Sequence, residues 1–159
     1  MKTPVIYHST HHGNTEKIAG VISEVFGAEL LKPPAVKVYE LHQYDFIGFG
    51  SGVYFGKHHK VLLNFVKKLP PLGKKVFIFS TSGKGMVGNY HKALRAELLQ
   101  IKCEIIGEFA CKGFDTFGLF SLIGGINNGH PDRDDVENAK AFARSLQKKI
   151  LAMDNGSVG

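Results

Sequence analysis

Short apolar segments alternate with helical patterns along this chain, and this alternation is the feature that most restricts its fold. Four segments are rich in branched or aromatic residues and are bounded by glycine or polar residues: Val5–Ser9, Phe46–Gly50, Val76–Ser80 and Ile105–Ala110. Ala28–Leu31 is a shorter candidate, followed by Pro33 and Pro34. Such runs predict strands that are buried on both faces of a parallel sheet.

Apolar residues at helical spacing fill the intervals between these segments. The stripes are Ile18, Val21, Ile22 and Val25; Leu62, Phe65, Val66 and Leu69; Leu94, Leu98 and Ile101; and Val136, Ala139, Ala143, Leu146 and Ile150. Asp132 to Asp135 offer a cap for the last helix. The pattern predicts an α/β fold: a single domain over residues 1–159 with three α/β/α layers around a doubly wound sheet, and with Asp154–Gly159 as a frayed tail.

Composition narrows the class of protein. The chain has 159 residues, 43% of them hydrophobic and 21% charged, and no apolar run long enough to span a membrane. Only Cys103 and Cys111 occur, so no disulfide framework is expected and a reducing cytoplasm is the default location. The net charge is +6, but no basic stripe is interleaved with aromatic residues, which argues against nucleic acid and favours an acidic protein partner.

The first strand is followed by a turn that is suited to an anion. Ser9–Thr15 supplies hydroxyl, amide and glycine residues just before a helix, where backbone N–H groups and the helix dipole attract negative charge. No Gly-Lys-Ser/Thr closes a Walker A loop, and Gly13 stands alone rather than within a dinucleotide fingerprint. The turn therefore indicates a phosphomonoester ligand.

Three further strand ends are rich in glycine, hydroxyl or aromatic residues: Ser51–Gly56, Thr81–Gly85 and Cys111–Phe114. In an open parallel sheet the carboxyl ends of the strands meet at one edge, where ligands bind. The connection Lys112–His130 is unusually long and aromatic, which favours a packed lid or a partner surface.

With these loops in place, the sequence resembles the flavodoxin-like family of FMN-binding proteins. The first turn is similar to the family pattern Ser/Thr-x-Thr-Gly-Asn-Thr, with a histidine pair where the family usually has one threonine. The resemblance implies a five-stranded parallel sheet with strand order 2-1-3-4-5 and an FMN site formed by three loops. The implied cofactor-binding residues are Ser9, Thr10, His11, His12, Gly13, Asn14 and Thr15 at the phosphate; Gly52, Val53, Tyr54, Phe55 and Gly56 at the ring; and Thr81, Ser82, Gly83, Lys84 and Gly85 at the pyrimidine edge.

The resemblance implies a carrier of one or two electrons between redox proteins. An FMN-dependent NAD(P)H or quinone reductase, a protoporphyrinogen oxidase-like enzyme and a cofactor-free binding module are the alternatives. We expect Tyr54 or Phe55 to stack on the flavin, and we expect no metal.

This chain is basic where many members of the family are acidic. We therefore expect Lys57, His58 and Lys84 to act as cations beside the ring and to favour its anionic reduced form. Phe117, Leu119 and Phe120 are expected either to contact an acidic partner or to close the core beneath the long connection.

Overall fold

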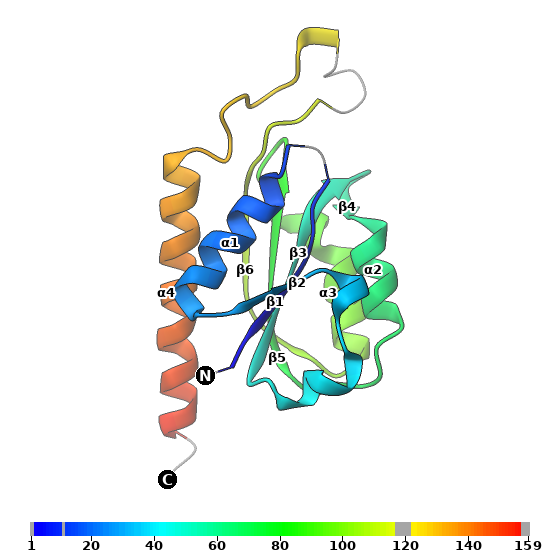
Figure 1. The fold of residues 1–159 in the computed structure, drawn as a ribbon, viewed down its shortest axis with the longest axis vertical. Coiled ribbons are helices and arrows are strands. Elements are labelled where there is room, and N and C mark those ends of the chain that lie inside the picture. The colour runs from blue at the N-terminus through cyan, green and yellow to red at the C-terminus, as the bar shows by residue number, and fades with distance from the viewer. Residues whose placement is uncertain (1, 11, 117–121, 157–159) are drawn as a thin grey trace.

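The computed structural model of the chain describes residues 2–10, 12–116 and 122–156 (Figure 1). A twisted sheet forms the centre, and helices cover both of its faces. The strands are β1 (Pro4–His8), β2 (Glu29–Leu31), β3 (Phe46–Tyr54), β4 (Lys57–His58), β5 (Lys75–Ser82) and β6 (Glu104–Lys112).

The sheet order confirms the predicted topology. Five parallel strands lie in the order β2-β1-β3-β5-β6, which is the 2-1-3-4-5 arrangement once β4 is set aside. The two-residue strand β4 was not predicted; it pairs antiparallel with the end of β3, with Val53 opposite His58 and Tyr54 opposite Lys57. We call residues Val53–His58 the hairpin.

Within the described residues, helices and 3₁₀ turns connect the strands, and α4 follows the last of them. The helices are α1 (Asn14–Phe26), α2 (Lys60–Lys67), α3 (Lys92–Gln100) and α4 (Arg133–Gly156); the turns are η1 (Pro33–Ala35), η2 (Val38–Gln43) and η3 (Gly88–His91). Of the segment expected to be a frayed tail, Asp154–Gly156 belong to the last turn of α4, and residues 157–159 lie outside the described part. No helix within the described ranges is long and apolar enough to cross a membrane.

Two apolar clusters hold the layers together. One packs α1 and α4 against one sheet face through residues such as Ile18, Phe77 and Leu146, and the other packs α2 and α3 against the opposite face. Close packing between β3 and β5 depends on glycine: a Cβ at Gly48 would lie 2.2 Å from Phe77 Cζ, and one at Gly50 would lie 2.2 Å from Phe79 Cζ. The small residues of β3 thus make room for the large rings of β5.

The register brings the loops that follow β1, β3, β5 and β6 to one edge of the sheet. His8 lies opposite Ser51, Ser51 opposite Ser80, and Thr81 opposite Cys111. Because these residues end or nearly end their strands, the loops that follow them surround a common space.

Candidate functional site

A cavity of about 450 Å³ opens at this carboxyl edge, and its volume is typical of a small-molecule or cofactor site. Its walls come from four loops that are far apart in the sequence. The lining residues are Thr10, His12, Asn14, Thr15, Gly52, Val53, Tyr54, Phe55, Gly56, Thr81, Ser82, Gly83, Lys84, Tyr90, Gly113, Phe114, Asp115, Thr116 and Ile126.

The loop Ser9–Thr15, which we call the first loop, brings the start of α1 to the cavity. Gly13 precedes the helix with φ +65°, a left-handed conformation that glycine adopts at little cost. Thr15 is buried, and its hydroxyl lies 2.9 Å from that of Thr81 on β5. The backbone N–H groups at this helix end and the nearby hydroxyls suit an anion.

The hairpin forms a second wall, with an aromatic ring at its tip. Phe55 and Gly56 occupy its two-residue turn with φ +52° and +75°, the pattern of a type I′ turn. A left-handed conformation is unfavourable for Phe55, yet this residue is 86% exposed and lies at the cavity wall. The neighbouring Tyr54 hydroxyl is hydrogen-bonded to the hydroxyl of Thr10 in the first loop.

The loop Thr81–Gly85, which we call the third loop, closes the end of β5. Ser82 Oγ accepts a hydrogen bond from the Gly85 backbone N–H at 2.8 Å, which folds the loop back on itself. A Cβ at Gly83 would lie 3.0 Å from Ile126 Cδ1 and 3.2 Å from Asp115 Oδ2, so the backbone here closely approaches the segment after β6.

That segment supplies a wall we call the lid platform, residues 113–116 and 126–131. Asp115 and Ile126 exchange two backbone hydrogen bonds of 3.0 and 2.7 Å, as in a short antiparallel bridge. Asn127 Nδ2 donates to Gly83 O at 2.7 Å, and Asn14 Nδ2 donates to Phe114 O at 2.8 Å. The platform is thus tied to both the third loop and the first, and in Figure 1 the connection extends beyond the sheet edge.

Most of the residues singled out from the sequence line the cavity. The described residues that do not line it are Ser9, Gly13 and Gly85. The hydroxyl of Ser9 instead accepts a hydrogen bond from the Glu16 N–H at 3.3 Å. His11 lies outside the described residues. Phe117, Leu119 and Phe120 also lie outside them, and of the long apolar connection Leu122 and Ile123 are described and highly exposed.

Several lining residues were not among the predicted set. Gly113 and Phe114 belong to the strand-end loop Cys111–Phe114, which was expected at this edge but was not assigned to the cofactor. Asp115, Thr116 and Ile126 belong to the long connection, whose aromatic content indicated a lid but not which residues face the cavity. Tyr90 lies in η3 and belongs to none of the predicted loops. The only feature of the sequence that could have indicated it is an isolated aromatic residue just before a helix.

The expectation that His58 acts as a cation beside the ring is wrong. Its side chain is buried beneath the hairpin, where Nε2 lies 3.1 Å from Phe79 O. Burial, with His91 close by at a ring-centroid distance of 4.8 Å, lowers the pKa of His58 to about 4. The imidazole is therefore neutral at pH 7, and Lys57 and Lys84 remain as exposed cations near the cavity.

His91 is a second buried histidine beneath the cavity. Nε2 lies 2.7 Å from Ser80 Oγ and Nδ1 lies 3.2 Å from Glu108 Oε1, while Arg95 donates to both oxygens of Glu108. Burial, and to a lesser degree the nearby positive charge of Arg95, lowers the pKa of His91 to about 4. Because Ser80 is fully buried, this Ser-His-Glu arrangement offers no accessible nucleophile and serves to join η3 to β5 and β6.

Cys111 is buried near the end of β6. Burial, followed by the negative charges of Asp135 and Asp132, raises the pKa of its thiol to about 12. The thiol is therefore protonated at pH 7, which makes it a poor nucleophile.

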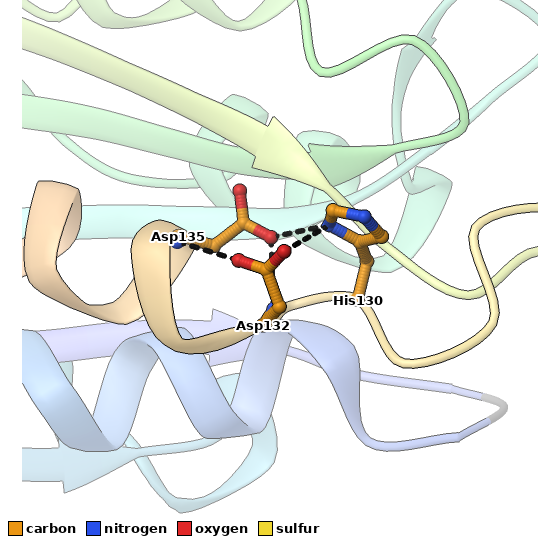
Figure 2. A group of neighbouring side chains, drawn as sticks. All are labelled: His130, Asp132 and Asp135. Atoms are coloured by element: carbon orange, nitrogen blue, oxygen red, sulfur yellow. Dashed lines mark hydrogen bonds and ion pairs between the residues drawn. The ribbon is translucent and has the colours of Figure 1, made fainter.

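Figure 2 shows three potential metal ligands, His130, Asp132 and Asp135, whose ligand atoms lie within 4.8 Å of one another. The two carboxylates form a reciprocal cap at the start of α4: Asp132 Oδ1 accepts from the Asp135 N–H, and Asp135 Oδ2 from the Asp132 N–H, both at 2.9 Å. His130 Nδ1 lies 2.6 Å from Asp135 Oδ2. The cluster thus fastens the end of the lid platform to α4, and the predicted cap is confirmed.

A doubly wound α/β sheet with its cavity at the carboxyl edge, between the first and third strands, defines a known class of ligand-binding proteins. The flavodoxin-domain family profile matches residues 5–106, and the chain belongs to this family. A curated relative, an uncharacterized protein of Methanocaldococcus jannaschii, is 47% identical over 149 residues, covering 93% of this chain and 99% of the relative.

Solved structures share the fold at low sequence identity. A flavodoxin from the domain Archaea aligns with a TM-score of 0.64 and 19% identity over 94% of this chain and 99% of that one. Flavodoxin 2 from Bacillus cereus gives a TM-score of 0.65 and 21% identity, with the same coverage. Rubredoxin:oxygen oxidoreductase from Desulfovibrio gigas gives 0.65 and 18% identity over 95% of this chain and 36% of that one. These likenesses support the fold.

Proposed function

We propose that this protein is an electron-transfer flavoprotein that holds FMN non-covalently in the cavity at the carboxyl edge of the sheet. The observation that carries the proposal is that the cavity has two chemically different walls. The first loop and the start of α1 supply hydroxyl and N–H donors, and the hairpin supplies Gly56 and the aromatic residues Tyr54 and Phe55. A phosphorylated ligand with a flat apolar ring matches both walls.

The residues of the first loop, the hairpin and the third loop fit such a ligand. Thr10, Asn14 and Thr15 would hold the phosphate, together with backbone N–H groups of the first loop. Tyr54 is tied to Thr10, so Phe55 is the ring of the hairpin that we assign to stacking on the flavin. Thr81–Lys84 would lie along the pyrimidine edge. The cofactor supplies the redox chemistry, while these residues bind it, orient it and set the charge around it.

The proposal is tested by titrating the apoprotein with FMN, FAD and riboflavin and following the absorption and fluorescence of the flavin. We expect FMN to bind most tightly, because the phosphate adds charge-assisted hydrogen bonds of about 1.5–3 kcal/mol each before offsets. Equal affinity for riboflavin and FMN would contradict the phosphate assignment, and no binding of any flavin would contradict the cofactor.

A matched pair of variants locates the phosphate end. Thr15→Ala removes the hydroxyl and should weaken FMN while leaving riboflavin nearly unchanged. Thr15→Ser keeps the hydroxyl and its bond to Thr81, so it should bind FMN like the parent. If both variants weaken riboflavin as much as FMN, the hydroxyl acts through folding and not through the phosphate.

The charge of the chain supports an acidic redox protein as the partner. The net charge is +6, and Lys57, Lys84 and Lys112 are exposed on loops that border the cavity. Opposite charges raise association rates, and salt reduces the effect. Electron transfer to an acidic acceptor should therefore slow with increasing ionic strength, while a basic acceptor should stay slow. If the rate of electron transfer to the acidic acceptor does not depend on salt concentration, the proposal of an acidic partner is contradicted.

The lid platform favours a second candidate, an FMN-dependent reductase of a small substrate such as NAD(P)H or a quinone. Phe114, Thr116 and Ile126 add a further wall to the cavity, against which a small molecule could bind beside the cofactor. Stopped-flow mixing of the FMN-loaded protein with NADPH or a quinone separates the two functions. Rapid, saturable reduction or reoxidation supports the enzyme, and second-order exchange with redox proteins alone supports the carrier.

A further inference from the structure

Two histidines that do not line the cavity connect the first loop with the hairpin. His8 ends β1, directly before the first loop, and His59 directly follows β4, next to the hairpin. Their ring centroids are 4.2 Å apart with an interplanar angle of 31°. We call this pair the histidine stack.

The stack continues into the hairpin and returns to the first loop. The ring of Tyr54 meets His59 edge to face, with centroids 5.1 Å apart at 89°. The hydroxyl of Tyr54 is hydrogen-bonded to that of Thr10, two residues beyond His8. A closed circuit of side chains therefore joins the loop proposed for the phosphate to the wall proposed for the ring.

We infer that His8 and His59 are positioning residues: their stacked rings hold Tyr54, and with it the hairpin, against the first loop. This inference rests on the proposed function only for the identity of the ligand. The positions of the two walls relative to each other belong to the protein itself and can be followed without any ligand.

The surroundings of both rings favour the neutral form. His59 Nδ1 accepts a hydrogen bond from the Val61 N–H at 3.1 Å and so caps α2, which leaves that nitrogen no room for a proton. His8 Nε2 is buried and has no hydrogen-bond partner among the described residues, so a proton there would meet no acceptor.

The surrounding charges act in the same direction. Burial lowers the pKa of both imidazoles, and nearby positive charge adds to this: Lys32 beside His8, and His8 and Lys60 beside His59. The carboxylate of Glu16 lies 3.8 Å from Lys32 and 2.7 Å from the Tyr7 hydroxyl, where it is already paired. Protonation of His8 therefore places a cation near Lys32, and protonation of His59 places one near Lys60. When both rings are protonated, two cations face each other in the stack, which should separate it.

Two variants distinguish the stack from the cap. His59→Asn removes the ring but keeps a side chain that caps helices well, so α2 should retain its first turn. His8→Phe keeps a flat ring against His59 but cannot be protonated. Hydrogen exchange of the ligand-free protein, corrected for intrinsic rates, reports the opening of the hairpin at pH 7.5 and 5.5. Amides of β3 and β5 in the sheet centre report any general loosening.

In the parent protein we expect hairpin opening to increase at least tenfold on acidification, beyond any change in the sheet centre. In His59→Asn the hairpin amides should exchange at both pH values as fast as those of the parent do at pH 5.5, while the Val61 amide stays protected. His8→Phe should open less than the parent in acid, because only His59 remains to be protonated in the stack. The FMN affinity should follow the same order: it should weaken in acid for the parent, stay weak at both pH values for His59→Asn, and weaken less than in the parent for His8→Phe.

The inference fails if the hairpin amides of His59→Asn exchange like those of the parent at both pH values. It also fails if His8→Phe opens in acid as the parent does. If FMN does not bind at all while the hairpin amides behave as described, the proposed function fails and the positioning role stands.

Discussion

The two walls of the cavity are built in different ways. The hairpin is local: a two-residue turn joins neighbouring strands, and one strained residue, Phe55, carries an exposed ring. The lid platform is held at a distance, by Asn14 to Phe114, Lys17 to Pro131 and Asn127 to Gly83, across 100, 114 and 44 residues of sequence.

The difference teaches where each wall is vulnerable. The hairpin depends on the conformation of its turn and on the neutral histidines beneath and beside it. The platform depends on single amide and ammonium groups that donate to backbone carbonyls. A change of pH should therefore act first on the hairpin, and loss of one polar side chain should act first on the platform.

The largest expected effect is acid destabilisation through the histidines beneath the hairpin. His58 and His91 have folded pKa values of about 4, below the 6.5 of an unfolded chain, so the unfolded state takes up protons first as the pH falls. The stability they confer is complete above pH 6.5 and is lost between pH 6.5 and 4, by about 3 kcal/mol for His58 alone.

Urea unfolding at several pH values measures this loss. His58→Met removes one of the titrating groups from the buried site and should flatten the acid limb of the stability curve. If the parent and this variant lose stability in parallel between pH 6.5 and 4, protonation of His58 does not cause the acid sensitivity expected of the hairpin.

The next effect tests the platform at Asn127, which has φ +56° and donates to Gly83 O. Asn127→Gly keeps the left-handed backbone and loses the hydrogen bond, at a cost of about 1 kcal/mol. Asn127→Ala also strains the backbone and should cost about 2 kcal/mol. Hydrogen exchange should show faster opening at Asp115 and Ile126 in both variants, with the hairpin unchanged. Equal costs for the two variants would argue against the backbone contribution.

A smaller effect of opposite sign is expected at the hairpin tip. Phe55→Asn creates the Asn-Gly pair that type I′ turns prefer and relieves the left-handed phenylalanine, so the ligand-free protein should become more stable by about 1 kcal/mol. The same change removes the ring proposed to stack on the flavin, so FMN should bind more weakly. Thermal unfolding and FMN titration check both halves. A variant that is no more stable than the parent would show that Phe55 carries no strain.

The smallest effect concerns charge. Lys57→Glu on the hairpin and Lys84→Glu on the third loop should each make the potential of bound FMN more negative, by on the order of 20 mV at low salt and less at high salt. Lys148→Glu, on α4, serves as a control for net charge. If Lys148→Glu shifts the potential as much as the other two variants, the effect comes from net charge and not from the position of the lysines near the cavity.

The sequence predicted the elements whose signals are local. Apolar runs located the strands, helical stripes located the helices, and hydroxyl and glycine residues located the three loops. The platform contacts could not be predicted, because Asn14 looked like a ligand residue and nothing local shows that its amide reaches Phe114. His58 was assigned wrongly because strand β4 has two residues and no periodicity, so a buried histidine there resembled one in an open loop.

The long-range ties of the platform also bear on when the cavity is completed during synthesis. The first loop emerges early, but the backbone carbonyls that meet Asn14 and Lys17 lie more than a hundred residues later. Contacts this distant form late, after the sheet they rest on. The N-terminal end of α1 therefore stands open on the growing chain, and the pocket gains its last wall once residues near Pro131 have left the ribosome. Loading of the proposed FMN should therefore follow the synthesis of that segment.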